Sequence, residues 1–265
     1  MIPSPIHKAL SIFRSSSARF LLMGGQACIL YGGAEFSRDI DIAVDPDAEN
    51  LEAVREALER LEAERVFVPD LDRSALIRGH ACHFRARAPG AEGTRIDMMS
   101  KMRGCGPFEE LWEKRSIVDL QGIGEVPVLS LSDLVRAKKT QRERDWPMIR
   151  RLIEADVIQN AGTPSPNRIA FWLQECRTAR LLEEFARRHP QACERVAVNR
   201  PLLNHALAAD RESLLVGLEE EERREREADA EYWRPLRKEL EQMLRERRRS
   251  SGSNPEIKRD NPLVG

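Results

Sequence analysis

The first apolar run sets the pattern for the N-terminal half of the chain. Residues 20–23 (FLLM) are continuously apolar, which predicts a buried strand. Gly24 and Gly25 interrupt the run, and a helix is expected from about Gln26. A glycine pair before a helix brings bare backbone N–H groups to the positive end of that helix, which suits phosphate. This segment therefore predicts a strand, a turn and a helix, with a candidate phosphate contact at the turn.

A second strand with two acidic residues follows. In the segment 39–44 (DIDIAV) polar and apolar residues alternate, so Asp39 and Asp41 share one face and Ile40 and Ile42 the other. Two carboxylates on one face repel each other unless a cation lies between them. Carboxylate oxygens are hard ligands that suit Mg²⁺. We therefore expect a magnesium site at this strand.

Asp97 is the candidate for a third carboxylate. It lies in the segment 94–99 (TRIDMM), which reads as the hairpin partner of a strand within 80–88. The flanking Ile96 and Met98 place Asp97 and Arg95 on the opposite face. Asp97 could instead be a simple surface partner of Arg95. Asp72, in a polar loop, and Asp119, after a separate strand, are the alternatives.

The remaining periodicity predicts an α/β region followed by helices. Ser130 and Asp133 form a capping box at a helix start. Other helices are expected at 5–13, 47–64, 108–114 and 168–188, and other strands at 66–68, 117–118 and 125–129.

The C-terminal region changes composition after a linker at 160–167. A long charged helix is expected over 206–249, with Pro235 kinking or splitting it. Glu219–Arg223, Glu220–Arg224 and Glu222–Arg226 have the stabilising order four residues apart, so a solvated helix is favoured over a partner-docking arm. We predict an α/β domain at 1–158, a helical domain at 168–249 and a disordered tail at 250–265.

Composition limits the classes of partner. A net charge of −1 over 265 residues, with 33% charged residues, excludes simple bulk attraction to nucleic acid. The five cysteines are scattered, odd in number and without a CxxC pair, which favours reduced thiols and a cytoplasmic protein. The start of the chain does not lead into a signal-peptide core, and no apolar run approaches a membrane span. His80, Cys82 and His83 lack a second Cys/His pair, so the two histidines are expected to line the sheet beside the site.

The order of these features resembles the nucleotidyltransferase superfamily, whose motif is an apolar residue, Gly-Gly or Gly-Ser, a helix, then Asp-x-Asp. Met23-Gly24-Gly25 and Asp39-Ile40-Asp41 match it. The chain looks most like the bacterial minimal nucleotidyltransferases, including the AbiEii-type toxins of toxin–antitoxin systems. Ser37 stands where that family has Thr, and Glu35 where it has Arg.

A second phrase of that family, "Val-x-Ser-Leu-x-Asp-Leu" followed by a Lys and by "Arg-x-[Arg/Lys]-Asp", is similar to residues 128–145. It is filled here by Val128, Ser130, Leu131, Asp133, Leu134, Lys138, Arg142, Arg144 and Asp145.

The resemblance implies a mixed sheet flanked by helices, with an all-helical C-terminal region covering one side of the cleft. It also implies Mg²⁺ on Asp39, Asp41 and Asp97 and a nucleoside triphosphate as substrate. The nucleotide would lie against Gly24, Gly25, Ser37, Arg38 and Lys138. The acceptor would be an RNA 3′ end such as that of tRNA, a protein hydroxyl or a small molecule.

Two rival functions stay open. A catalytically silent relative, acting as a binding protein or antitoxin, is favoured by Glu35. An interaction protein would work through the charged C-terminal helix, with the α/β part as its scaffold. Either an enzyme or a silent relative could have a cognate partner protein.

Overall fold

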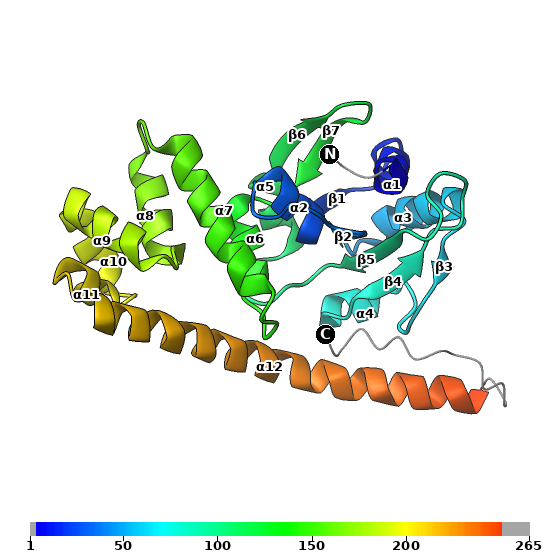
Figure 1. Cartoon of the computed structure of the whole chain (residues 1–265). Coiled ribbons are helices and arrows are strands. Elements are labelled where there is room, and N and C mark those ends of the chain that lie inside the picture. Colours follow the sequence, from blue (N-terminus) through cyan, green and yellow to red (C-terminus); the bar gives the residue numbers. More distant parts are fainter. Residues whose placement is uncertain (1–3, 251–265) are drawn as a thin grey trace.

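A mixed seven-stranded sheet forms the centre of the computed structural model, which describes residues 4–250 (Figure 1). The strand order is β3-β4-β5-β2-β1-β7-β6. β1 is antiparallel to β2 and parallel to β7, while β2 is parallel to β5. The strands are β1 (Phe20–Met23), β2 (Asp39–Val44), β3 (Glu64–Arg65), β4 (Cys82–Arg85), β5 (Arg95–Met99), β6 (Ser116–Leu120) and β7 (Gly124–Val128).

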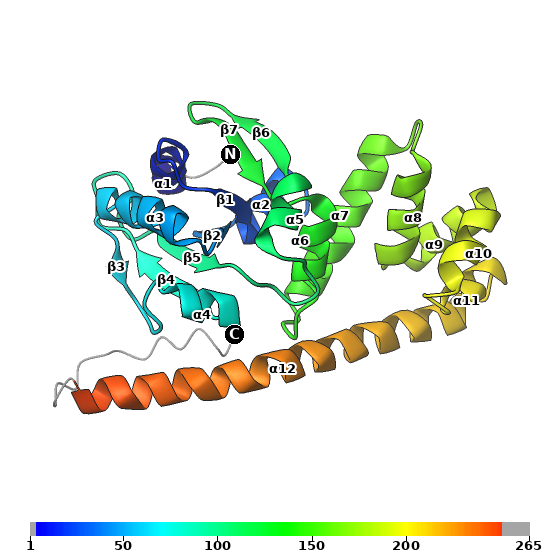
Figure 2. The ribbon, with the colours of Figure 1, turned by 180° about the vertical axis from the view of Figure 1, so that it is seen from behind.

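Helices flank this sheet and then form a C-terminal helical region, as predicted (Figure 2). The helices around the sheet are α1 (Ser4–Arg14), α2 (Gly24–Leu30), α3 (Ala48–Arg60), α4 (Arg73–Arg78), α5 (Phe108–Glu113), α6 (Leu131–Ala137) and α7 (Asp145–Asn160). The helical region contains α8 (Pro166–Glu175), α9 (Ala179–Arg188), α10 (Pro190–Ala197), α11 (Leu203–Leu207) and α12 (Arg211–Ser250).

The two central strands divide their residues cleanly between two faces. Ile40 and Ile42 of β2 and Ile96 and Met98 of β5 are fully buried. The alternating acids Asp39, Asp41 and Asp97 are partly exposed. Burying these four side chains stabilises the sheet by roughly 1.5–3 kcal/mol each and fixes which face carries the polar residues.

Three sequence predictions need correction in the N-terminal half. The strand expected at 66–68 is instead β3, Glu64–Arg65, because Arg65 pairs with Phe84 before the chain turns away. The loop expected before β4 contains helix α4, which the side chain of Asp72 caps by accepting from the N–H of Ala75 at 3.0 Å. Helix α2 begins at Gly24 itself, without a turn before Gln26.

Helix α12 is continuous over 40 residues and begins at Arg211, later than predicted. Pro235 does not split it. Contacts on both sides hold the helix in register, since Asp229 and Leu236 are both buried against the rest of the chain. Tertiary packing therefore outweighs the missing backbone hydrogen bond at the proline.

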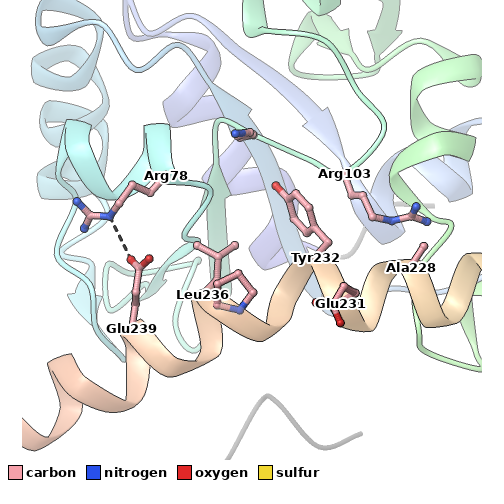
Figure 3. Close-up of a pocket in the computed structure, with 9 residues that line it drawn as sticks. Arg78, Arg103, Ala228, Glu231, Tyr232, Leu236 and Glu239 are labelled. Carbon is pink, nitrogen blue, oxygen red and sulfur yellow. Dashed lines mark ion pairs between the residues drawn. The ribbon is translucent and has the colours of Figure 1, made fainter.

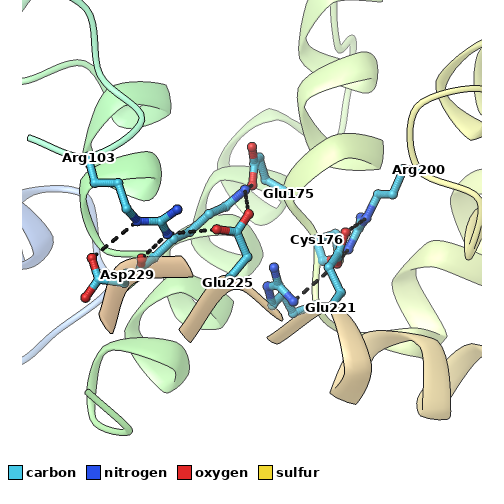
Figure 4. A network of polar contacts seen from close by, with 9 residues as sticks. Arg103, Glu175, Cys176, Arg200, Glu221, Glu225 and Asp229 are labelled. Atoms are coloured by element: carbon cyan, nitrogen blue, oxygen red, sulfur yellow. Dashed lines mark hydrogen bonds and ion pairs between the residues drawn. The ribbon is translucent and has the colours of Figure 1, made fainter. Parts of the chain in front are cut away.

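One face of α12 carries acidic residues that bind the body of the protein (Figure 4). Glu221, Glu225 and Asp229 recur every four residues and so lie on one side of the helix. Arg103, in the loop after β5, pairs with Glu225 at 2.7 Å and with Asp229 at 3.2 Å. Arg200 binds Glu221 at 2.7 Å. The prediction of a solvated helix is therefore wrong for this face.

Ion pairs also form between residues of α12 itself. Of the three pairs predicted from spacing, Glu222–Arg226 is present at 3.6 Å, and Arg226 also pairs with Glu143 at 3.3 Å. Arg223 instead turns toward Glu227, at 2.9 Å. The Arg223–Glu227 pair is exposed, and such pairs contribute little to stability.

The described part of the chain has no helix with the length and apolar character needed to cross a bilayer. Residues 251–265 of the expected tail lie outside the described residues. The division into domains at 1–158 and 168–249 stays a prediction.

Replacing Asp229 by Ala should lower the free energy of unfolding by about 2 kcal/mol or more, since it leaves partly buried groups unpaired. Asp229 accepts from the backbone N–H of Gln141 at 2.9 Å as well as from Arg103. Urea denaturation measures the change. Glu227→Ala is the matched control on the exposed face and should cost less than about 0.5 kcal/mol. Equal losses in both variants would show that α12 is not anchored through Asp229.

Candidate functional site

Strand pairing brings the three predicted carboxylates onto one face of the sheet. In the parallel pair β2–β5, Asp41 lies directly opposite Asp97, and Asp39 lies opposite Arg95. Neighbouring strands are about 4.8 Å apart. Asp39, Asp41 and Asp97 (the acid trio below) therefore occupy adjacent positions on the face opposite the buried isoleucines.

Asp97 is held by two positively charged or hydrogen-bonding neighbours. Its Oδ1 accepts from Arg95 Nε at 2.8 Å and lies 2.8 Å from His83 Nδ1. Burial alone would raise the pKa of Asp97, but the contacts with His83 and Arg95 outweigh it, so the pKa is lowered. Asp97 is therefore an anion at neutral pH, with Oδ2 left for a further contact. The ion pair with Arg95, which was the alternative interpretation of Asp97, is present, and His83 lies beside the site as predicted.

Asp41 lies against the glycine pair at the start of α2. Its Oδ2 accepts from the backbone N–H of Gly25 at 3.3 Å. Burial and the charge of Asp97 raise the pKa of Asp41 to about 6, although Lys138 and the Gly25 N–H oppose the shift. A positive ion near this carboxylate would therefore relieve a real electrostatic cost.

Asp39 lies where the acid trio meets a group of arginines. Burial and the charge of Asp97 raise its pKa, and Arg95, Arg85 and Arg144 partly offset that effect. The arginines come from β5, β4 and the residue just before α7, respectively. The site is thus a mixture of acids and cations rather than a purely acidic cluster.

The glycines at the start of α2 are required by close approach. A Cβ on Gly24, which has φ +61°, would lie 1.9 Å from Asp41 Oδ2. A Cβ on Gly25 would lie 2.4 Å from Ser37 Oγ. Ser37 donates in turn to the carbonyl of Asp39 at 3.3 Å. The glycine pair therefore lets β2 and its preceding loop pack directly against the helix start.

Lys138 lies close enough to Asp41 for the two charges to interact. Its Nζ is 2.9 Å from Asp145 Oδ1, and Thr140 donates to the other carboxylate oxygen at 2.6 Å. Burial would lower the pKa of Lys138, but Asp145 and other anions outweigh it and raise the pKa. Asp145 therefore pairs with Lys138.

The other sequence candidates lie elsewhere. Arg38 lies over the exposed ring of Phe36, 5.6 Å from its centroid. Asp119 is on the edge strand β6, at the far side of the sheet from β5. His80 is fully buried and its Nε2 contacts Glu239 of α12 at 2.8 Å, so it does not line the site.

The acid trio offers oxygen donors that suit a metal ion, but the donors are not close enough together to form a metal site. Within residues 4–250, no group of three or more His, Cys, Asp or Glu side chains stands at metal-holding geometry. This includes His80, Cys82 and His83. In the acid trio, Asp97 Oδ1 already contacts Arg95 and His83, so Oδ2 is the oxygen that would remain for a metal ion.

Two cavities lie away from the acid trio. One of about 610 Å³ is formed where α12 crosses the loop after β5, and Arg103, Tyr232 and Leu236 are among its lining residues (Figure 3). A second, of about 550 Å³, lies beside α3 and is lined in part by Arg55 and Phe84. Neither of these two cavities is lined by a residue of the trio.

Sequence reasoning missed Arg85. In the β4–β5 hairpin, His83 lies opposite Asp97 and Arg85 lies opposite Arg95. The alternation of residues 82–85 was the available signal, since it places both side chains on one face. Their position beside the acids depends on the hairpin register, which the sequence did not fix.

Comparisons with known proteins give a limited result. No protein-family model matches the chain, and no curated protein matches it. Among solved structures, a "putative nucleotidyltransferase (TM1012)" from Thermotoga maritima has a TM-score of 0.34 and 16% identity, covering 59% of this chain and 89% of its own. A "putative nucleotidyltransferase" from H. pylori has a TM-score of 0.38 and 14% identity, covering 83% and 95%. JHP933 from Helicobacter pylori has a TM-score of 0.34 and 12% identity, covering 88% and 96%. These TM-scores are low, and the function proposed below rests on this chain's own residues.

Gly24→Ala tests the close approach of Asp41. A positive φ alone disfavours Ala by about 1–2 kcal/mol. At Gly24 the clash with the carboxylate adds to this, so we expect a loss of at least about 3 kcal/mol in the free energy of unfolding. Gly104→Ala is the control, since Gly104 has φ +75° and open space around it. Similar losses in the two variants would show that Asp41 moves aside freely.

Asp41→Asn tests the raised pKa. Between the unfolded pKa near 3.8 and the folded pKa of about 6, the folded state binds more protons than the unfolded state. Ionisation of Asp41 therefore lowers the free energy of unfolding of the wild-type protein as the pH rises. The free energy of unfolding of Asp41→Asn relative to wild type should therefore increase by about 2 kcal/mol from pH 4 to pH 7. Urea titrations at these pH values measure it. A flat or decreasing difference would contradict the assignment.

Proposed function

We propose that this protein is a Mg²⁺-dependent nucleotidyltransferase. In the reaction, an acceptor hydroxyl attacks the α-phosphorus of a nucleoside triphosphate. The oxygen–phosphorus bond to the acceptor forms while the bond to pyrophosphate breaks, and the hydroxyl proton is lost. The products are the acceptor carrying a nucleoside monophosphate, and pyrophosphate. Such transfers depend mainly on positioning and on neutralising phosphate charge.

One observation carries the proposal: Asp41 and Asp97 lie opposite each other on parallel strands, with Asp39 two residues before Asp41. Three half-buried carboxylates on one face have no structural advantage, because they repel one another. Their location beside the glycine pair of α2 matches the order of the nucleotidyltransferase motif described above.

The donor chemistry fits Mg²⁺. The trio offers only carboxylate oxygens, the ligands that this ion prefers. Burial, together with the charge of Asp97, raises the pKa values of Asp39 and Asp41, and a divalent cation would favour their charged forms. Asp39, Asp41 and Asp97 would hold the ion. When bound, it would lower the pKa of the attacking hydroxyl and neutralise the leaving pyrophosphate.

The surrounding residues would bind and orient the nucleotide. Gly24 and Gly25 would allow phosphate oxygens to approach the backbone. Ser37 would add a hydroxyl donor, and Lys138, whose charge interacts with that of Asp41, would contact a phosphate. Arg38 stays a candidate contact from the loop before β2. Asp97 has a lowered pKa and is therefore better suited to holding a cation than to accepting a proton.

The acceptor is proposed as an RNA 3′ end, a protein hydroxyl or a small molecule. A role as the toxin of a toxin–antitoxin pair, with a cognate partner protein, follows from the motif resemblance to AbiEii-type proteins. Local cations around Asp39 provide a place for a phosphate-bearing acceptor despite the net charge of −1.

A catalytically silent nucleotide-binding protein is the second candidate. It is favoured by Asp97, whose Oδ1 is shared by Arg95 and His83. If those contacts persist with nucleotide bound, Oδ1 of Asp97 is not available to a metal ion. Such a protein would bind a nucleoside triphosphate but transfer nothing.

Label transfer from α-labelled nucleoside triphosphates tests the enzyme. The full-length protein is incubated with each triphosphate, Mg²⁺ and a cell lysate, with and without a chelator. We expect labelled acceptor only with Mg²⁺. Asp39→Asn and Asp41→Asn should each lower transfer at least about a hundredfold, because each removes a carboxylate ligand.

Asp119→Asn is the matched control and should retain full transfer, since Asp119 is exposed on β6. Undiminished transfer by Asp39→Asn would exclude the assigned metal site. Triphosphate binding without any transfer would favour the silent protein.

A further inference from the structure

The face of the sheet that carries the acid trio extends to β4, where it carries the positively charged side chain of Arg85. Arg85 of β4 lies opposite Arg95 of β5, which lies opposite Asp39 of β2. The three side chains therefore form one row across the sheet, with Asp39 at one end and Arg85 at the other. Arg85 is exposed and acts on the Asp39 carboxylate through its charge.

The arrangement is electrostatically unfavourable by itself. Like charges directly opposite each other on a sheet destabilise it. Arg95 is already committed to Asp97 at 2.8 Å. Glu64, the residue opposite Arg85 on β3, is instead 2.8 Å from Arg87. Within residues 4–250, Arg85 makes neither an ion pair nor a side-chain hydrogen bond. Arg85 therefore lies next to Arg95, and the nearby carboxylate of Glu64 is paired with Arg87. This leaves the Arg85 guanidinium well placed to bind an external anion.

We propose that Arg85 binds a phosphate oxyanion of a substrate, at a subsite next to Asp39 on the β4 side of the acid trio. This inference rests on the function proposed above, because phosphate is the anion that a nucleotidyltransferase handles. The planar fork of a guanidinium matches two phosphate oxygens. The phosphate comes either from the triphosphate tail of the nucleotide or from the backbone of a nucleic-acid acceptor.

The proposal predicts different effects on phosphate binding and on protein stability. If Arg85 were an ordinary surface residue, its replacement would change neither the affinity for phosphate nor the free energy of unfolding. If it serves a bound anion, Arg85→Gln should leave the ligand-free protein as stable as wild type or slightly more stable, since it relieves repulsion with Arg95. The same change should weaken phosphate binding.

Calorimetric titration of the full-length protein provides the test. One probe is inorganic tripolyphosphate with Mg²⁺, and the other is a short single-stranded oligoribonucleotide without a terminal phosphate. We expect Arg85→Gln to raise the Kd for at least one probe about tenfold or more, because a charge-assisted hydrogen bond is lost. Arg85→Lys should recover part of the affinity.

Arg87→Gln is the matched control, two residues along the chain and paired with Glu64. It should change either Kd less than about twofold, since exposed pairs contribute little. A selective loss for tripolyphosphate assigns the subsite to the nucleotide tail, and a selective loss for the oligonucleotide assigns it to the acceptor. Unchanged binding of both probes by Arg85→Gln, or no binding of either probe by wild type, overturns the proposal.

The same titrations on the Asp39→Asn variant distinguish a failure of this inference from a failure of the proposed function. If Asp39→Asn removes Mg²⁺-dependent binding and Arg85→Gln has no effect, only the role of Arg85 is wrong. If Arg85→Gln weakens binding while neither Mg²⁺ nor Asp39→Asn matters, the phosphate subsite stands and the metal-dependent enzyme does not.

Discussion

The parallel pairing of β2 with β5 is the constraint on which the candidate site depends. Its register is fixed by four fully buried apolar side chains, Ile40, Ile42, Ile96 and Met98. A shift of one residue would place these side chains in water and the acids in the core. The hydrophobic face therefore determines that Asp41 meets Asp97, even though the two carboxylates repel each other. The alternation of side chains along β2 and β5 therefore fixes both the packing of the core and the position of the acids.

The protein offsets that repulsion with hydrogen bonds and positive charges close to the acids. Arg95 and His83 hold one oxygen of Asp97, and the Lys138–Asp145 pair lies beside Asp41. The result is an uneven trio, in which the pKa of Asp97 is lowered and that of Asp41 is raised to about 6. This asymmetry distinguishes the acids chemically, so they need not play the same part in binding a cation.

Helix α12 connects the C-terminal region to the same neighbourhood. Through Asp229 it binds Arg103 and the backbone of Gln141, in the segment that begins with Lys138. Arg103 also donates to the carbonyl of Lys139 at 2.5 Å. A helix whose sequence suggests a solvated rod is therefore part of the support for the loop that carries the candidate phosphate-binding lysine.

The sequence by itself determined the local elements of this protein. Alternation placed Asp39 and Asp41 on one face, and the capping box at Ser130 marked the start of α6, since both depend on neighbouring residues. It did not reveal that Arg85 shares a cross-strand row with Asp39, that His80 contacts Glu239 of α12 and does not line the site, or that Pro235 leaves its helix whole. Those features were decided by the tertiary structure alone, because strand register and helix docking bring together residues up to 159 positions apart, and no local pattern encodes such a meeting.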